Sequence, residues 1–238
     1  MDKRSKIALY VIGAVIVLMM IAEVTKPKAI NWRDSYSASD KIPLGCFVLY
    51  NELNTFTNQP ILTSEESVYQ YLKTIDSTQT KSMVFINNRI YFDSEESKAL
   101  LKFVEEGNTV FLSSSYFYGN VMDTLNIAVE RQSSNLFKAT SSHKFTSPYL
   151  KRYNREFQDV IENSQFVSVD TLNTTVLGTV TTLDDNGAEM SKPNFIKINY
   201  GNSEGQFILH TNPFAFTNYH LLKGNADYAA AVLSFLPK

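Results

Sequence analysis

An uncharged apolar run near the N-terminus constrains the fold more than any other feature of the sequence. Residues 7–22 (IALYVIGAVIVLMMIA) carry no charge, and the run extends to residue 24 with only Glu23 interrupting it. As a helix at about 1.5 Å per residue, residues 7–24 are roughly 27 Å long, close to the hydrocarbon thickness of a bilayer. A stretch with no polar face is not typical of a core helix at a chain terminus. The run therefore predicts a transmembrane helix over residues 7–24.

The flanks of this run favour an uncleaved signal anchor. Residues 1–6 form a short basic tail with Lys3, Arg4 and Lys6, an outline that cleaved signal peptides share. The run is longer than a typical signal core, however, and no small-x-small cleavage site follows it. Lys and Arg are equally numerous on its two sides, but the tight N-terminal cluster with its α-amino group favours N-inside. We expect a single-pass inner-membrane protein whose soluble domain lies in the periplasm.

Composition excludes several classes of protein. Hydrophobic residues make up 44% and charged residues 19% of the 238-residue chain, which indicates a globular protein. The net charge of −2 argues against a nucleic-acid-binding module, because such modules carry a basic stripe. A single cysteine excludes a disulfide framework and a cysteine-rich zinc site. The histidines lack the spacing of metal ligands, so we expect no metal and no other cofactor.

Beyond the anchor, residues 25–43 are predicted to be a linker and a loop leading into an α/β domain of residues 44–238. Trp32 and Tyr36 in this loop fit either a membrane interface or packing on the domain. Continuous apolar runs at 83–86 and 109–112 predict buried strands, and Asp93 with Glu96 predicts a capping box for the helix between them. Strand, helix and strand in this order predict a parallel βαβ unit.

The other elements follow from shorter patterns. Residues 61–62 favour a short strand, and Thr63 with Glu66 predicts a second capping box before a helix around Leu72. Residues 132–147 have no strong period, residues 166–169 and 175–182 are β-rich, and residues 184–187 predict a turn. Alternation at 195–200 and an apolar run at 206–210 predict a hairpin. Asn225 is expected to cap a final helix. Together these elements predict an α/β domain with parallel core strands and a strand-rich C-terminal portion.

Cys46 and the histidines are weak candidates for chemistry. Cys46 follows Gly45 near a helix start, where the helix dipole lowers a thiol pKa, yet a small buried apolar residue is the better interpretation. His210 closes a strand, and His220 is expected in the loop after it. Both are interpreted as structural residues rather than catalytic ones.

The polar residues that follow the two parallel strands are the best geometric candidates for a ligand or partner site. Open α/β sheets bind ligands at the carboxyl ends of their strands, where helix N-termini also point. Such residues are also common in ordinary βα loops, where they only satisfy the backbone. The predicted rim consists of Gly45, Asn87, Asn88, Ser113, Ser114 and Ser115.

Three blocks of sequence resemble a known family of bacterial membrane proteins, domain of unknown function 4350. They are residues 32–53 (WRDSYSASDKIPLGCFVLYNEL), residues 85–88 (FINN) with 100–117 (LLKFVEEGNTVFLSSSYF), and residues 210–237 (HTNPFAFTNYHLLKGNADYAAAVLSFLP). The resemblance implies a class I glutamine-amidotransferase-like, or flavodoxin-like, sandwich with no known enzymatic activity. It also implies envelope protein partners and suggests a MoxR-type ATPase system as their setting. Members typically continue to a second membrane span, so we expect a truncated product or a short variant.

Two functions fit these observations. The first is a membrane-anchored, non-catalytic α/β domain that binds a partner as a component of an envelope assembly. The second is a hydrolase or an amidotransferase-like enzyme that uses Cys46 or a serine of 113–115. The first is favoured, because no nucleophile has a visible base or oxyanion turn beside it.

Overall fold

The computed structural model describes residues 2–56, 60–75, 80–133, 140–158, 162–183, 189–201 and 204–237. The chain divides into two compact units, Met1–Asn31 and Trp32–Lys238, each of which is described by itself. The turn predicted at 184–187 lies outside the described residues.

The first unit contains helix α1 (Lys3–Thr25), which includes the predicted span and the basic residues before it. No residue of this helix is buried, and its apolar window has a mean hydropathy of 2.6. By length and composition it is long and apolar enough to cross a membrane, a test that signal sequences also pass.

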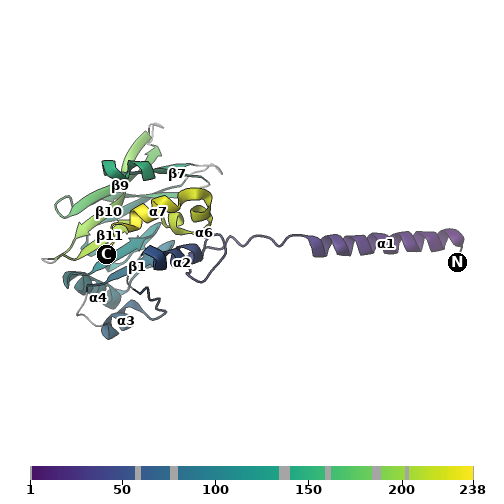
Figure 1. Cartoon of the computed structure of the whole chain (residues 1–238), viewed down its shortest axis with the longest axis horizontal. Helices are drawn as coiled ribbons and strands as arrows, with labels where there is room; N and C mark the ends of the chain where they lie inside the picture. Colours follow the sequence, from purple (N-terminus) through teal and green to yellow (C-terminus); the bar gives the residue numbers. More distant parts are fainter. Residues whose placement is uncertain are drawn as a thin grey trace. The chain divides into compact units, whose positions relative to one another are not determined.

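The second unit is built around a curled, seven-stranded mixed sheet (Figure 1). In spatial order its strands are β1 (Ser82–Ile86), β3 (Thr109–Ser113), β11 (Gln206–His210), β10 (Glu189–Asn199), β9 (Thr174–Leu183), β6 (Ser141–Phe145) and β7 (Arg155–Phe157). The first three are parallel to one another, and the remaining pairs are antiparallel. The predicted parallel strands and the predicted hairpin of β10 with β11 are confirmed, giving a mixed α/β fold.

Two small sheets extend this core. Strands β2 (Arg89–Tyr91) and β4 (Tyr116–Tyr118) pair in parallel, and β5 (Ala128–Ser133) pairs with β8 (Glu162–Ser168) in antiparallel orientation. Two residues separate the end of β1 from the start of β2, and two separate the end of β3 from the start of β4. The β2–β4 pair therefore continues the two parallel strands beyond their carboxyl ends.

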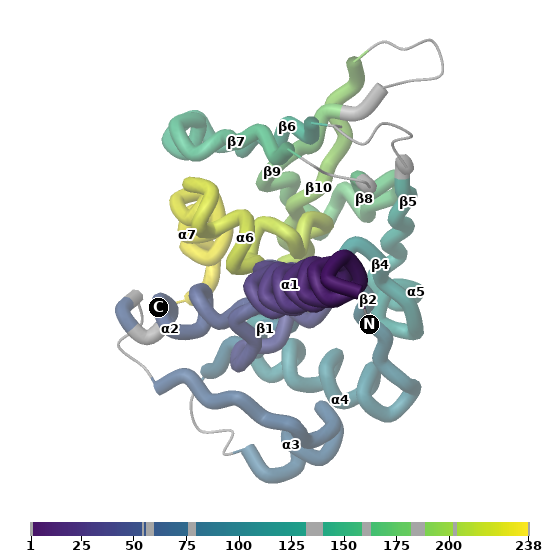
Figure 2. Tube along the Cα trace, turned by 90° about the vertical axis from the view of Figure 1, so that its right-hand side faces the viewer, coloured from purple at the N-terminus to yellow at the C-terminus, as the bar shows by residue number. Residues whose placement is uncertain are grey.

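Helices cover both faces of the central sheet. One face packs against α2 (Phe47–Phe56), α7 (Ala226–Leu233) and the short helical segments before α7, as Figure 1 shows. The other face carries α3 (Val68–Thr74) and α4 (Ser94–Glu105), which lie side by side (Figure 2), and α5 (Asn120–Thr124). The short segments are η1 (Pro148–Tyr153), η2 (Pro213–Phe216), α6 (Asn218–His220) and a π turn at Leu221–Asn225.

Alternation along the strands divides the core into two clusters. On β3, Phe111 packs into the cluster under α7, whereas Val110 and Leu112 pack into the cluster under α4. All three side chains are fully buried. This two-sided burial is the reason that the parallel strands appear in the sequence as continuous apolar runs.

Two capping predictions had opposite outcomes. The Asp93 carboxylate accepts hydrogen bonds from the N–H groups of Glu95 and Glu96, and Glu96 reaches back to the Asp93 N–H, so this capping box is confirmed. The second box is wrong, because α3 begins at Val68 and Ser67 caps it. The strand predicted at 61–62 does not form either, and Leu62 is exposed.

The loop leading into the domain packs more closely than a linker would. The compact unit starts at Trp32, so residues 32–43 belong with the domain rather than with a free linker. Tyr36 is buried in the cluster under α7. The half-exposed ring of Trp32 meets that of Tyr219 edge-on, with 5.0 Å between their centres. The contacts of both aromatic residues lie within the domain, so they favour packing on the domain over a place at a membrane interface.

Candidate functional site

The parallel strands end at a common edge, as the sequence predicts. Ile86 is in register with Ser113, and Ser113 is in register with His210. The N–H of Asn87 donates a hydrogen bond to the carbonyl oxygen of Ser113, at 3.1 Å. Asn88 lies beside them and donates from its side chain to Asp34 of the lead-in loop, at 3.0 Å. The structure thus brings the predicted asparagines and serines together.

The three serines are not an exposed rim, and this corrects part of the predicted site. All three are buried. The Ser113 hydroxyl lies 3.0 Å from Nδ1 of His210, and that of Ser114 lies 2.7 Å from the carbonyl oxygen of Tyr116. The carbonyl oxygen of Ser115 accepts a hydrogen bond from Ser164 at 2.8 Å. These groups thus form hydrogen bonds with backbone groups and with His210 inside the protein.

Histidines and tyrosine form a polar cluster in the core beneath α7. Nε2 of His210 lies 3.1 Å from the Tyr228 hydroxyl. His143 lies 2.7 Å from the Ser141 hydroxyl and 2.8 Å from the Asn194 amide. Burial lowers the pKa of His143 to about 3, and it lowers the pKa of His210 well below its usual value. Both rings are held neutral and hydrogen-bonded, which fits a structural role.

His220 differs from its predicted position. It lies at the end of α6 rather than in a loop, and it is buried. Its ring meets that of Phe157 at 5.4 Å between centres.

The Cys46 side chain is also buried. It is 5% exposed, and burial raises the pKa of its thiol to about 12. The thiol is therefore protonated at neutral pH, opposite to the activated thiolate that a cysteine nucleophile needs.

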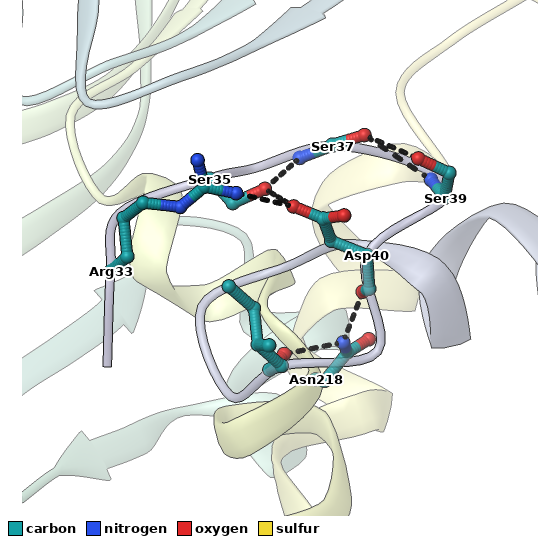
Figure 3. Close-up of polar contacts among 7 residues, drawn as sticks. Arg33, Ser35, Ser37, Ser39, Asp40 and Asn218 are labelled. Atoms are coloured by element: carbon teal, nitrogen blue, oxygen red, sulfur yellow. Dashed lines mark hydrogen bonds and ion pairs between the residues drawn. The ribbon is translucent and has the colours of Figure 1, made fainter. Parts of the chain in front are cut away.

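A network around Asn218 fastens the lead-in loop to the domain (Figure 3). Asn218 donates from its side chain to the carbonyl oxygens of Asp40 and Ile42, at 2.9 and 2.8 Å. Its side-chain oxygen accepts from the N–H of Val48 at 2.8 Å, in the first turn of α2. The Asp40 carboxylate in turn contacts Ser35 and Arg33.

Gly45 is fixed within this network by its lack of a side chain. A Cβ at this position would lie 2.1 Å from the carbonyl oxygen of Asp40, so no larger residue fits without displacing the loop. The N-terminus of α2, which the sequence suggested as a ligand site, is thus capped by Asn218. Gly45 is needed because the backbone of Asp40 passes too close to it for any side chain.

An exposed surface of tyrosine and arginine lies on the β2–β4 pair, just beyond the edge. In this pair Arg89 is opposite Tyr116, and Tyr91 is opposite Tyr118. The central residue Ile90 points inward and is 7% exposed, whereas Tyr91 and Tyr118 are 68% and 50% exposed. Period-two alternation explains the division, because successive side chains of a strand point to opposite faces.

Two guanidinium groups frame the ring of Tyr116. That of Arg89 lies 5.1 Å from the ring centre, and that of Arg131 on β5 lies 4.9 Å from it. The Tyr116 and Tyr118 rings stack at 6.2 Å with an interplanar angle of 13°. We call this surface, formed by Arg89, Tyr91, Tyr116, Tyr118 and Arg131, the Tyr–Arg face.

Sequence reasoning missed the Tyr–Arg face. Its signal is the pair of triplets RIY and YFY, which follow the predicted parallel strands 83–86 and 109–112 after two and three residues. Read as alternating strands, the triplets place aromatic and arginine side chains on one outward face.

The family profile described as "Domain of unknown function (DUF4350)" matches residues 38–233. The chain belongs to this family. The match confirms the resemblance of the three sequence blocks to this family. It covers most of the second compact unit, Trp32–Lys238. No curated protein matches the sequence.

Several solved structures resemble the DUF4350 chain in fold. The mmIFT52 N-terminal domain superposes with a TM-score of 0.60 at 13% identity, covering 85% of this chain and 93% of that one. The exo-beta-1,4-mannosidase Op5Man5 from Opitutaceae bacterium strain TAV5 gives 0.49 at 11% identity, covering 90% of this chain and 35% of that one. The beta-galactosidase from Bacillus circulans sp. alkalophilus gives 0.40 at 11% identity, with 63% and 23% covered. Since the chain spans about a third or less of each glycosidase, and identities are low, only the IFT52 likeness informs the fold.

Proposed function

We propose that this DUF4350 protein is a membrane-anchored, non-catalytic binding domain that serves as an assembly component of a bacterial envelope complex. The observation that carries the proposal is the Tyr–Arg face. Exposed tyrosines and arginines are the residues that most often dominate binding energy at protein interfaces, because they combine large apolar area with hydrogen-bonding tips. The partner is an envelope protein, and the family resemblance suggests a MoxR-type ATPase system as its setting.

The position of the face supports a role in binding. Ligand sites of open α/β sheets lie outside the carboxyl ends of the parallel strands. The β2–β4 pair extends from those ends on β1 and β3. Ile90 and the partly buried Phe117 anchor its inner side in the core beside α4, so the outer tyrosines are presented from a fixed support.

The enzyme alternative draws less support from the geometry. Ser113, Ser114 and Cys46 are buried, and the hydroxyl groups of the two serines already have partners in the protein. The thiol pKa is raised rather than lowered. A nucleophile must reach its substrate and be activated by a base, so these groups are poor candidates in this conformation.

The proposal also includes the orientation of α1 in the membrane and the fold family of the domain. We place α1 in the inner membrane with the basic tail inside and the α/β domain in the periplasm, on the charge pattern of the N-terminus. The class I glutamine-amidotransferase-like sandwich implied by the family resemblance is compatible with three parallel strands covered by helices on both sides.

Capture of partners from native membranes tests the proposal. The double variant Tyr118→Ala with Arg131→Ala should recover at least tenfold less partner protein than the wild-type chain, and its melting temperature should be unchanged. Tyr149 is the matched control, because it is 89% exposed and lies on η1, a helical segment outside the β2–β4 and β5–β8 sheets that carry the Tyr–Arg face. Equal recovery with the double variant and with Tyr149→Ala would contradict the proposed face.

A further inference from the structure

Strand β1 is an outermost strand of the central sheet. Its partner in the sheet order is β3, and among the residues that the structure describes no strand pairs with its outer edge. The N–H of Thr109 bonds to Lys81 and the N–H of Asn87 bonds to Ser113, which fixes the phase of the parallel ladder. The backbone groups of the alternate residues Ser82, Val84 and Ile86 therefore point away from β3.

The same open edge continues along β2. In the described ranges its one partner strand is β4, and the N–H of Tyr116 bonds to the carbonyl oxygen of Asn88. By the same ladder rule, the backbone groups of Arg89 and Tyr91 point outward. Within the described part of the chain, these outward groups of β1 and β2 form no hydrogen bond.

Strand β1 lacks the usual protections against pairing. Natural edge strands are commonly shielded by proline, by a bulge or by an inward charge. The sequence of β1 is SMVFI, with no proline or charge, and its pairing with β3 has no register shift. Val84 is 40% exposed, and residues 60–66, which precede α3, adopt no strand conformation that would cover it.

A hollow lies along this edge, and its lining residues indicate which kind of segment can bind there. It has a volume of about 330 Å³ and is lined by residues 84–87 and 89–92, from β1, β2 and their flanks. Most of the lining side chains are aliphatic or aromatic, and among the described lining residues Asn87 is polar and Arg89 is charged. An occupant thus needs a free main chain to pair with the strands, apolar side chains for the hollow, and an acid to meet the guanidinium.

We propose that the β1–β2 edge receives an extended, acidic segment of a partner protein as an added strand. Main-chain hydrogen bonds to Val84 and Ile86 supply the pairing, and a carboxylate accepts hydrogen bonds from Arg89. This inference rests on the proposed function only in treating the domain as a binding module. It concerns the main-chain edge of β1 and β2, whereas the proposed function concerns the outward side chains of the Tyr–Arg face, and Arg89 is the side chain that both proposals use.

Amide exchange on the full chain in detergent micelles tests whether the edge is open. The N–H groups of Val84 and Ile86 should exchange fast, whereas those of Met83 and Phe85, which face β3, should be protected at least a hundredfold more. Protection of Val84 and Ile86 in the free protein would overturn the proposal, because it would mean that residues 60–66 or a second copy of the chain already cover the edge.

Binding of synthetic peptides, followed by fluorescence anisotropy, tests the occupant. The probe is a seven-residue peptide of alternating valine and glutamate, with one control in which lysine replaces glutamate and another with a central proline. The acidic peptide should bind saturably and protect the Val84 and Ile86 amides, and both controls should bind at least tenfold more weakly. Equal binding of the three peptides, or no saturable binding of the acidic one, would overturn the proposal.

Variants separate main-chain pairing from charge. Val84→Pro removes an outward donor and should weaken the acidic peptide at least tenfold, whereas Val84→Thr, which keeps the N–H, should not. Arg89→Glu should reverse the preference between the acidic and basic peptides, and it supplies a second test if Val84→Pro misfolds. An Arg89→Glu protein that still prefers the acidic peptide would contradict the assignment.

The two proposals fail separately. Tyr118→Ala with Arg131→Ala should leave peptide addition at the edge unchanged while reducing capture of membrane partners. Loss of peptide addition in that variant would mean that the edge and the face are one site, contrary to this inference.

Discussion

The side-chain oxygen of Asn218 accepts a hydrogen bond from the N–H of Val48 at 2.8 Å, across 170 residues of sequence. The same side chain donates to the carbonyl oxygens of Asp40 and Ile42. One buried amide thus caps α2 and also holds the lead-in loop of the domain, the contact that Figure 3 shows.

Removal of this side chain should destabilise the domain. Asn218→Ala deletes a helix cap and leaves two carbonyl oxygens without their donor, so we expect a loss of about 2–3 kcal/mol in the free energy of unfolding. Urea unfolding of the purified protein measures it. Asn51→Ala is the matched control, because Asn51 is exposed and its side chain donates to the carbonyl oxygen of Phe47 one turn earlier in α2. A loss below about 0.5 kcal/mol at Asn218 would contradict its role in the network.

Stability should fall in mild acid because of the buried histidines. The folded-state pKa values of His143 and His210 are lowered, that of His143 to about 3, so the unfolded chain binds protons below pH 6.5 that the native protein does not. Each histidine then removes up to about 1.4 kcal/mol per pH unit as pH falls below about 6, and stability is greatest above 6.5. Urea unfolding at pH 7.5, 6.0 and 5.0 measures the slope. His143→Gln should reduce it, and a flat profile in the wild type would contradict the neutral assignment.

Cys46 should react slowly in the folded protein. Burial raises its pKa to about 12, so the thiolate fraction at pH 8 is small and the side chain is shielded. Alkylation with iodoacetamide should be at least a hundredfold faster in 6 M guanidinium chloride than in buffer. Cys46→Ala should cost of order 1 kcal/mol, as for a small buried side chain. Rapid alkylation of the native protein would revive the thiol-enzyme alternative.

Protease accessibility should establish the orientation of the anchor. With the basic tail inside, protease added to intact spheroplasts should digest the α/β domain, while a cytoplasmic marker protein remains intact. Protection of the domain in intact spheroplasts, followed by digestion after lysis, would reverse the orientation.

Local sequence patterns predict much of the sheet and little of the site. The apolar runs that became β1 and β3 and the capping box of Asp93 depend on neighbouring residues, so they are visible in one sequence. The capping box expected at Thr63 failed because Ser67 lies directly before the apolar helix and caps it instead. Helix starts are ambiguous wherever several capping residues precede one apolar stripe.

The binding surface depends on contacts that local patterns do not contain. Strands β2 and β4 have three residues each, too few to show alternation by themselves, and their pairing places Tyr116 between Arg89 and Arg131. The burial of Ser113 follows from the fit of His210, which lies 97 residues further along the chain. Sequence reasoning found the correct edge of the sheet but not which side chains would face solvent there.

Site-specific photo-cross-linking in living cells tests the binding role of the Tyr–Arg face most directly. A benzophenone amino acid is placed at Tyr118 in the full-length chain, and in a second strain at Tyr149, which is even more exposed. Our account predicts a discrete cross-linked product to one envelope protein from position 118, lost when Arg131→Ala is added, and none from position 149. Products of equal yield from both positions, or none from position 118, would contradict it.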